Sequence, residues 1–160
     1  MTLNTSTDYS GKTQDMLIVQ DGNYTGEAAL VSFSYGTGLG KVIAGIQKLV
    51  QKVLLMLFTD AGSVTYDPSF GTGFMPYVRG GLLRDEADIV ATFNQAILVI
   101  QERLELDASA DTPDDETLES VEVTDVDVDL TQGLLKLGAT LTTAADTSVV
   151  VIIPITLVTQ

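Results

Sequence analysis

Apolar residues recur at three- and four-residue steps after residue 41, which is the period of an amphipathic helix. The face that they form consists of Val42, Ile46, Leu49, Val50, Val53, Met56 and Leu57. Lys41, Lys48 and Lys52 mark the opposite side. Residues 59–62 end the pattern, and Gly62 suits the left-handed conformation in which many helices terminate. The pattern therefore predicts a helix from Lys41 up to Thr59.

A second helical pattern follows three carboxylates. Asp85, Glu86 and Asp88 suit the first turn of a helix, where the helix dipole is positive. The apolar face after them consists of Ile89, Val90, Phe93, Ala96, Ile97 and Ile100. Two helices with such faces pack against each other or against a sheet.

The last forty residues alternate as strands do. Residues 121–130 alternate with one slip, since Val123 and Val126 are both apolar, and this slip predicts a bulge near Thr124 and Asp125. After a turn at 131–133, the returning strand alternates through Leu135, Leu137, Ala139 and Leu141. Residues 148–158 form the last strand, whose run 149–153 is apolar on both faces and must be central or covered. Pro154 places part of this strand at an edge or a bulge.

The beginning of the chain adds two shorter elements. Residues 15–20 and 26–34 are apolar and flank a turn at 21–23, so they can pair as a small hairpin. Residues 1–14 are polar and read as a flexible arm. The prediction is an α+β fold, with two main helices packed on a small, mostly antiparallel sheet of C-terminal strands and a possible N-terminal hairpin. Residues 15–160 form its single domain.

Composition excludes several functions. The 160 residues are 45% apolar, enough for one folded domain. The absence of cysteine and histidine removes disulfides, thiolate zinc sites and the commonest general base. A net charge of −14 argues against nucleic acid as a partner, and the apolar runs are too short to cross a membrane. We expect a protein made in the cytosol, with no cofactor and no small-molecule substrate.

The charge is concentrated in the second part of the chain. Residues 105–160 hold twelve carboxylates and one lysine. One interpretation is a solvated acidic face with an exposed acidic loop at 106–118. The other is an electrostatic surface for a basic neighbour.

Three possible chemical sites are weak. Residues 36–41 resemble a phosphate loop, but Tyr35 and Val42 stand where that motif needs glycine and serine or threonine. Asp125, Asp127 and Asp129 share a strand face and either hold calcium weakly or simply face solvent. Glu102 is the best candidate acid for glycoside hydrolysis, yet its neighbour Arg103 favours the ionised form. The sequence therefore predicts a protein that is not an enzyme.

The segment between the two helices carries a distinctive motif. The helix ends in Leu57-Phe58-Thr59, a turn contains Gly62, and Pro68-Ser69-Phe70-Gly71-Thr72-Gly73 follows. Pro68 fixes one backbone angle, whereas Gly71 and Gly73 free two others. Phe70 and Phe74 can anchor the ends of this loop in the core.

This motif, followed by a second helix and a C-terminal hairpin, resembles the small baseplate wedge protein, or sheath initiator, of contractile-tailed phages and related injection machines. The family has also been called lysozyme-like, and the resemblance covers roughly residues 41–141. It implies a structural protein of the virion tail baseplate that is assembled in the cytoplasm of the host bacterium. Such a protein joins the wedge to the sheath and templates the first sheath ring, so the implied partners are the tail sheath protein, baseplate wedge proteins and the tail tube.

The resemblance also implies contact residues. The C-terminal sheet would accept strands from sheath subunits, around Val149, Val151 and Ile153. Many family members have a Glu-Pro-Arg triplet near residue 102, which resembles a docking element for the wedge core. Here Glu102 and Arg103 are adjacent, without the proline, so the two charges either keep the docking role or finish the helix in solvent.

Two other functions stay open on the sequence alone. One is a peptidoglycan-degrading, lysozyme-like enzyme. The other is a tail-completion or tube-end protein of a different type.

Overall fold

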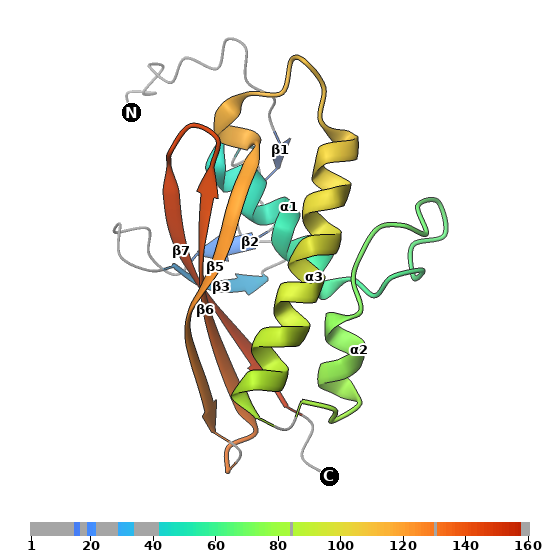
Figure 1. The fold of residues 1–160 in the computed structure, drawn as a ribbon, viewed down its shortest axis with the longest axis vertical. Helices are drawn as coiled ribbons and strands as arrows, with labels where there is room; N and C mark the ends of the chain where they lie inside the picture. The colour runs from blue at the N-terminus through green and yellow to red at the C-terminus, as the bar shows by residue number, and fades with distance from the viewer. Residues whose placement is uncertain are drawn as a thin grey trace, which may run out of the picture.

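The computed structural model describes residues 15, 16, 19–21, 29–33, 42–83, 85–129 and 131–157 (Figure 1). The elements in chain order are β1 (Asp15–Met16), β2 (Val19–Asp21), β3 (Ala29–Phe33), β4 (Val42–Ile43), α1 (Ile46–Phe58), α2 (Phe74–Arg79), α3 (Glu86–Asp107), the 3-10 turn η1 (Asp114–Glu116), β5 (Leu118–Asp129), β6 (Leu134–Thr143) and β7 (Ser148–Thr156). The predicted α+β class is confirmed.

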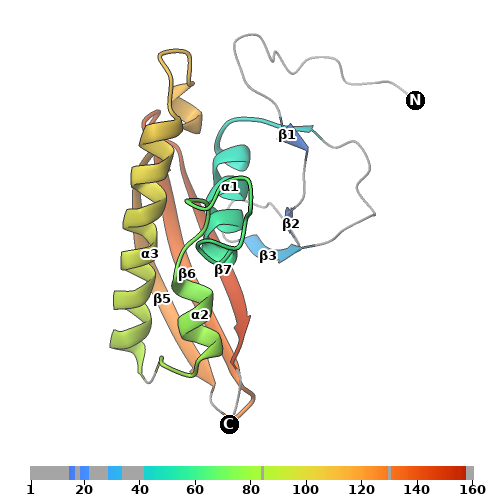
Figure 2. The same ribbon diagram turned by 90° about the vertical axis from the view of Figure 1, so that its right-hand side faces the viewer.

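The main sheet has the strand order β2-β3-β7-β6-β5. Strands β5, β6 and β7 are joined by two antiparallel connections, whereas β3 pairs with β7 in parallel. β7 therefore lies between two strands, as its two apolar faces predict. Figure 2 shows the three helices on one face of the sheet.

The predicted bulge in β5 is present. The register of β5 against β6 shifts between Val123 and Asp125, and this shift keeps Val121, Val123, Val126 and Val128 on the core side. Gly138 lies opposite the bulge, where an added Cβ would approach the Thr124 hydroxyl oxygen to 2.9 Å. A glycine at this position thus leaves room for the extra residue of β5.

Helix α1 begins later than the apolar pattern predicts. Val42 and Ile43 form β4, which pairs with β1, and the helix starts at Ile46. Gly45 precedes it with φ of +62°, a conformation that separates strand from helix. The predicted start at Lys41 was wrong because the apolar spacing of Val42 and Ile46 fits a helix as well as a strand followed by a turn.

Helix α3 begins where its carboxylates predict. The Asp85 carboxylate accepts a hydrogen bond of 2.8 Å from the Asp88 backbone N–H and caps the first turn. The helix continues to Asp107, however, and η1 covers Asp114–Glu116. The exposed acidic loop predicted at 106–118 is therefore shorter than expected, and its last carboxylate, Glu116, is largely buried.

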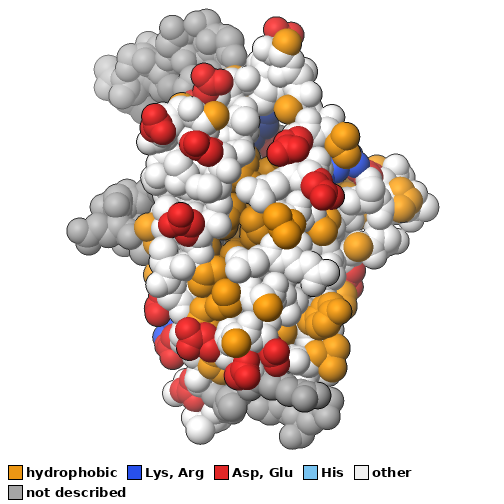
Figure 3. Space-filling model, in the orientation of Figure 1, with side chains coloured by type: hydrophobic (Ala, Val, Ile, Leu, Met, Phe, Trp, Pro, Cys, Tyr) orange, Lys and Arg blue, Asp and Glu red, His pale blue; other side chains and the backbone are white. Residues whose placement is uncertain are grey.

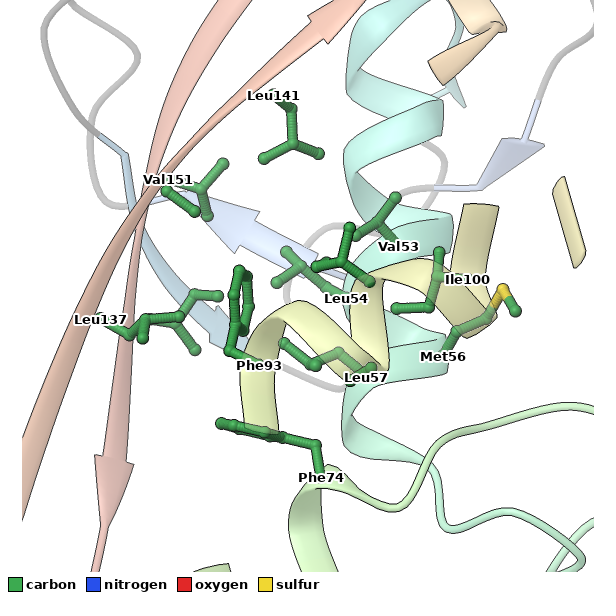
Figure 4. Close-up of a cluster of buried hydrophobic side chains, with 14 of the residues drawn as sticks. Val53, Leu54, Met56, Leu57, Phe74, Phe93, Ile100, Leu137, Leu141 and Val151 are labelled. Carbon is green, nitrogen blue, oxygen red and sulfur yellow. The ribbon is translucent and has the colours of Figure 1, made fainter. Parts of the chain in front are cut away.

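The core lies between the helices and the inner face of the sheet (Figure 4). Phe74 and Phe93 meet edge to face with ring centroids 6.0 Å apart. The inward residues of β6 and β7 complete the core from the other side: Leu135, Leu137, Ala139, Leu141, Val151, Ile153 and Ile155. Burial of these aliphatic and aromatic side chains is the main stabilising term of the fold.

The N-terminal hairpin forms with altered boundaries. β2 pairs with β3 in antiparallel fashion, as predicted, but Asp15 and Met16 separate from β2 and pair with β4. The predicted strand at 15–20 was thus wrong as a single element. The polar arm at 1–14 and the glycine-rich residues 36–41 lie outside the described residues.

Candidate functional site

Residues 59–73 form a loop whose two ends are joined by the backbone. The Thr72 N–H donates to the Thr59 carbonyl at 2.8 Å, and the Ala61 N–H donates to the Thr72 carbonyl at 3.0 Å. Inside the loop, the Gly62 N–H donates to the Pro68 carbonyl at 3.0 Å. The motif residues that are separated in the sequence thus meet in space.

The glycines of this motif have different roles. Gly71 has φ of +102° and lies against the backbone of Thr59, whereas Gly73 has φ of −83°. Gly62 has φ of +79°, but it lies in the turn after the helix, because α1 already ends at Phe58. The prediction that residues 59–62 end the helix and that Gly62 adopts a left-handed conformation is confirmed.

The anchoring aromatics are buried to different degrees. Phe74 is fully buried, and Phe70 is half-buried against the core. Phe74 is the first residue of the short helix α2, which directs its side chain into the core. The sequence pattern did not predict α2, because six residues are too few to show a helical period.

Arg103 fastens this loop to α3. Its guanidinium donates to the Ser69 hydroxyl at 2.6 Å and to the Asp67 carboxylate at 2.9 Å. Its Nε atom lies 3.1 Å from the Asp107 carboxylate. The guanidinium of Arg103 is therefore neither left in solvent at the end of the helix nor paired with Glu102 for docking, because it binds Asp67, Ser69 and Asp107 within the fold.

Glu102 lies on the outer face of α3, which also exposes apolar residues. Leu98 is 61% exposed, and Val99 with Tyr77 of α2 lines a shallow groove between the two helices. Figure 3 shows apolar groups gathered on this side of the molecule. The sequence pattern assigned only the inner face of α3, so this second apolar face was missed.

The β7 residues predicted to contact a partner belong to the core. Val151 and Ile153 are buried beneath the helices, and Val149 packs against them half-buried. β7 is paired along its whole length with β6, and with β3 at Val151 and Ile152. The side chains of Val151 and Ile153 are therefore not available to a partner in the folded protein, and only Val149 is partly exposed.

The outer edge of β5 is a better candidate. No other strand within the described residues pairs with that edge. The Ala144 N–H donates to the backbone carbonyl of Thr117, the residue before β5. The Thr143 N–H points the other way and donates to the backbone carbonyl of Thr147, the residue before β7. Since an antiparallel ladder alternates, the odd-numbered residues of β6 direct their main-chain groups to β7.

The partners of those odd-numbered residues in β5 direct their own main-chain groups away from β6. They are Val121, Val123, Val126 and Val128, paired with Leu141, Ala139, Leu137 and Leu135. Their side chains face the core, while their N–H and C=O groups point outward along the edge. This edge offers a row of unpaired backbone donors and acceptors, which is the requirement for adding a strand.

The aspartates on the solvent face of β5 have separate roles. Asp127 lies 3.4 Å from the Lys136 ammonium, and Asp129 accepts hydrogen bonds from Thr131 and Gln132 at the turn. The Thr131 hydroxyl and the Gln132 N–H lower the pKa of Asp129. Among the described residues no group of three potential ligands is arranged to hold a metal ion.

A second charged network joins α1 to α3. Burial acts to raise the pKa of Asp107, but the hydrogen bond and charge of Lys52, followed by Arg103, hold it below its usual value of 3.8. A carboxylate whose pKa is lower in the folded state stabilises that state above the unfolded pKa and loses this contribution as pH falls through the folded pKa.

Asp107→Asn is therefore expected to lower the free energy of unfolding at neutral pH and to have a decreasing effect below pH 4. Urea unfolding of both proteins across the acid range measures this difference. Asp111→Asn removes an exposed carboxylate that makes no ion pair among the described residues, and serves as the control. A destabilisation by Asp107→Asn that persists unchanged at the lowest pH would contradict the assignment.

Comparison with known proteins gives no relative. No protein-family model, curated protein or solved structure matches the chain. In the described part of the chain, no helix is both long and apolar enough to cross a membrane. The function must therefore be argued from the surfaces described above.

Proposed function

We propose that this protein is a structural component of a contractile tail baseplate, in which it joins the wedge to the sheath and templates the first sheath ring. The observation that carries the proposal is the outer edge of β5, with its outward main-chain groups at Val121, Val123, Val126 and Val128. The motif around Pro68 and Gly71, which resembles that of the sheath initiators, supports the same role.

The edge fits a strand donated by another chain. β5 has twelve residues, so an added strand would gain several main-chain hydrogen bonds without displacing a strand of the described fold. Its solvent face carries Glu119, Glu122, Asp125 and Asp127, and favours an incoming strand with lysine or arginine. These carboxylates also discourage two copies of β5 from pairing with each other.

The outer face of α3 is the second proposed contact, on the wedge side. Leu98 and Val99 give it an apolar centre, and Glu102 borders this centre. Apolar centres with polar borders are typical of protein interfaces. Since this face and the β5 edge belong to different elements, one molecule can hold a wedge protein and a sheath strand together.

Val126→Pro tests the strand-acceptor role. The Val126 N–H points outward, so proline removes a donor from the free edge without removing a hydrogen bond to β6. We expect the variant to fold and to lose the ability to start sheath polymers. Purified wild type and variants are mixed with the tail sheath and wedge proteins encoded beside this chain, and polymers are counted by electron microscopy.

Two substitutions control this experiment. Val126→Ala shortens the same side chain but keeps the N–H, and should still start polymers. Asp127→Pro removes a donor directed at β6, so it should lower the melting temperature, unlike Val126→Pro. Normal polymers on a folded Val126→Pro protein would refute the use of this edge, and no complex of the wild type with either neighbour would refute the baseplate role.

A further inference from the structure

A cleft of about 320 Å³ lies where α1, the end of α3 and the start of β5 meet. Figure 3 shows the surface hollowed beside the upper part of α3, with basic surface at its depth and carboxylates on both sides. The apolar part of the lining comes from three elements that are far apart in the sequence, at Leu49, Leu104 and Leu118. A space of this size accepts one large side chain of another molecule.

Two ion pairs hold the walls of the cleft. Lys48 lies 2.9 Å from Glu116, which also accepts a hydrogen bond from the Gly45 N–H at the start of α1. Lys52 lies 2.9 Å from Asp107 at the end of α3. Both lysines that line the cleft are therefore neutralised within the fold, so the cleft does not attract an anion.

The chain that borders the cleft is acidic: Glu105 lines the cleft, and Asp111 and Asp114 alternate with lining residues between Ser109 and Glu116. Glu105, Asp111 and Asp114 are exposed and make no ion pair among the described residues. Leu106 is 82% exposed beside Glu105. The apolar part of the lining, an exposed leucine and an excess of carboxylates together favour a ligand that is apolar at its centre and basic at its ends.

We propose that this cleft binds a basic segment of a partner protein, which inserts one large apolar side chain between Leu49, Leu104 and Leu118. Lysine or arginine residues that flank the inserted side chain pair with Glu105, Asp111 and Asp114. The segment binds at the end of α3, away from the pairing edge of β5, so this interaction does not depend on the strand-acceptor role.

The absence of tryptophan from the chain provides a direct assay. The probe is the peptide acetyl-Lys-Lys-Trp-Leu-Lys-Lys-amide, titrated with the full chain while the tryptophan emission is recorded. We expect a saturable shift of the emission to shorter wavelength, since the indole leaves water on binding. The shift should weaken with added salt, and the peptide with glutamate in place of lysine should give none.

Ala108→Phe and Ala110→Phe form a matched pair for locating the binding. Ala108 lines the cleft, whereas Ala110 is exposed two residues further along and is not part of the lining. Ala108→Phe should fill the space and weaken the affinity at least about tenfold. Ala110→Phe should leave the affinity unchanged, and thermal melting establishes that both variants fold.

A charge variant separates specific from general attraction. Glu105→Gln removes a carboxylate that lines the cleft, and Glu119→Gln removes one from β5 at a position outside the cleft. Weakening by Glu105→Gln alone supports the proposal. No emission shift with the wild type, or equal affinities of Ala108→Phe and Ala110→Phe, would overturn it.

Discussion

Gly71→Ala is expected to destabilise the protein by about 2 kcal/mol or more, because a non-glycine residue in this backbone region is strained. Gly71 has φ of +102°, and an added Cβ would lie 2.5 Å from the Thr59 carbonyl oxygen. That oxygen accepts the hydrogen bond from the Thr72 N–H which joins the two ends of the loop. The backbone therefore cannot move away without breaking this closure. Urea unfolding of the two proteins measures the loss.

Gly73→Ala is the matched control, two residues away in the same motif. Gly73 has φ of −83°, and the nearest atom to an added Cβ is a Tyr77 ring carbon at 3.7 Å, an ordinary contact. We expect the free energy of unfolding to change by less than about 0.5–1 kcal/mol. If the two substitutions had equal effects, the distinction between a required and an exchangeable glycine would be wrong.

Phe74→Ala is expected to cost about 3–5 kcal/mol, the range for removing a buried aromatic side chain. Phe74 is fully buried at the start of α2, and its ring meets Phe93 of α3 edge to face. Truncation removes this contact and leaves a cavity where α2, α3 and the sheet meet. Because small domains have only about 5–15 kcal/mol of stability, this change removes a large part of it.

Two comparisons show whether the loss comes from packing. Phe74→Leu keeps much of the volume and should cost clearly less than Phe74→Ala. Tyr66→Ala removes an aromatic side chain that is 94% exposed in the same loop region, and should change the free energy of unfolding by no more than about 0.5 kcal/mol. A small effect of Phe74→Ala would mean that α2 does not pack as described.

Both substitutions also bear on the proposed surfaces. Gly71 closes the loop that Arg103 fastens to α3, and Phe74 fixes α2 beside the outer face of α3. A loosened loop or a displaced α2 would change the groove next to Val99. We therefore expect binding on the wedge side to suffer before the β5 edge does.

The strands were the part of the fold most open to prediction. The position of the bulge in β5 follows from Val123 and Val126, which are three residues apart. In a regular strand their side chains would point to opposite faces, and an extra residue between them places both on the buried face. The central place of β7 follows from its two apolar faces. The ends of the helices were harder to predict from the sequence, since Val42 fits the apolar face of a helix as well as it fits β4.

The candidate surfaces were predicted less well. The resemblance to the sheath initiators implied a strand acceptor in the C-terminal sheet, with contacts around Val149, Val151 and Ile153. In the structure those valines and isoleucines fill the core, while the free edge belongs to the more acidic β5. The two apolar faces of β7 indicate that this strand is covered, but they do not indicate which of the remaining strands is outermost.

By itself, the sequence determined the class of the fold, the inward face of each long element and the loop that needs Gly71. These are local properties, because the periodicity of side chains and the sterics of a single residue act over a few positions. The tertiary structure alone decided the partner of Arg103, which lies 36 residues away at Asp67, the free edge of the sheet and the cleft between α1, α3 and β5. These features arise between elements, so they depend on how distant segments pack, which no local pattern records.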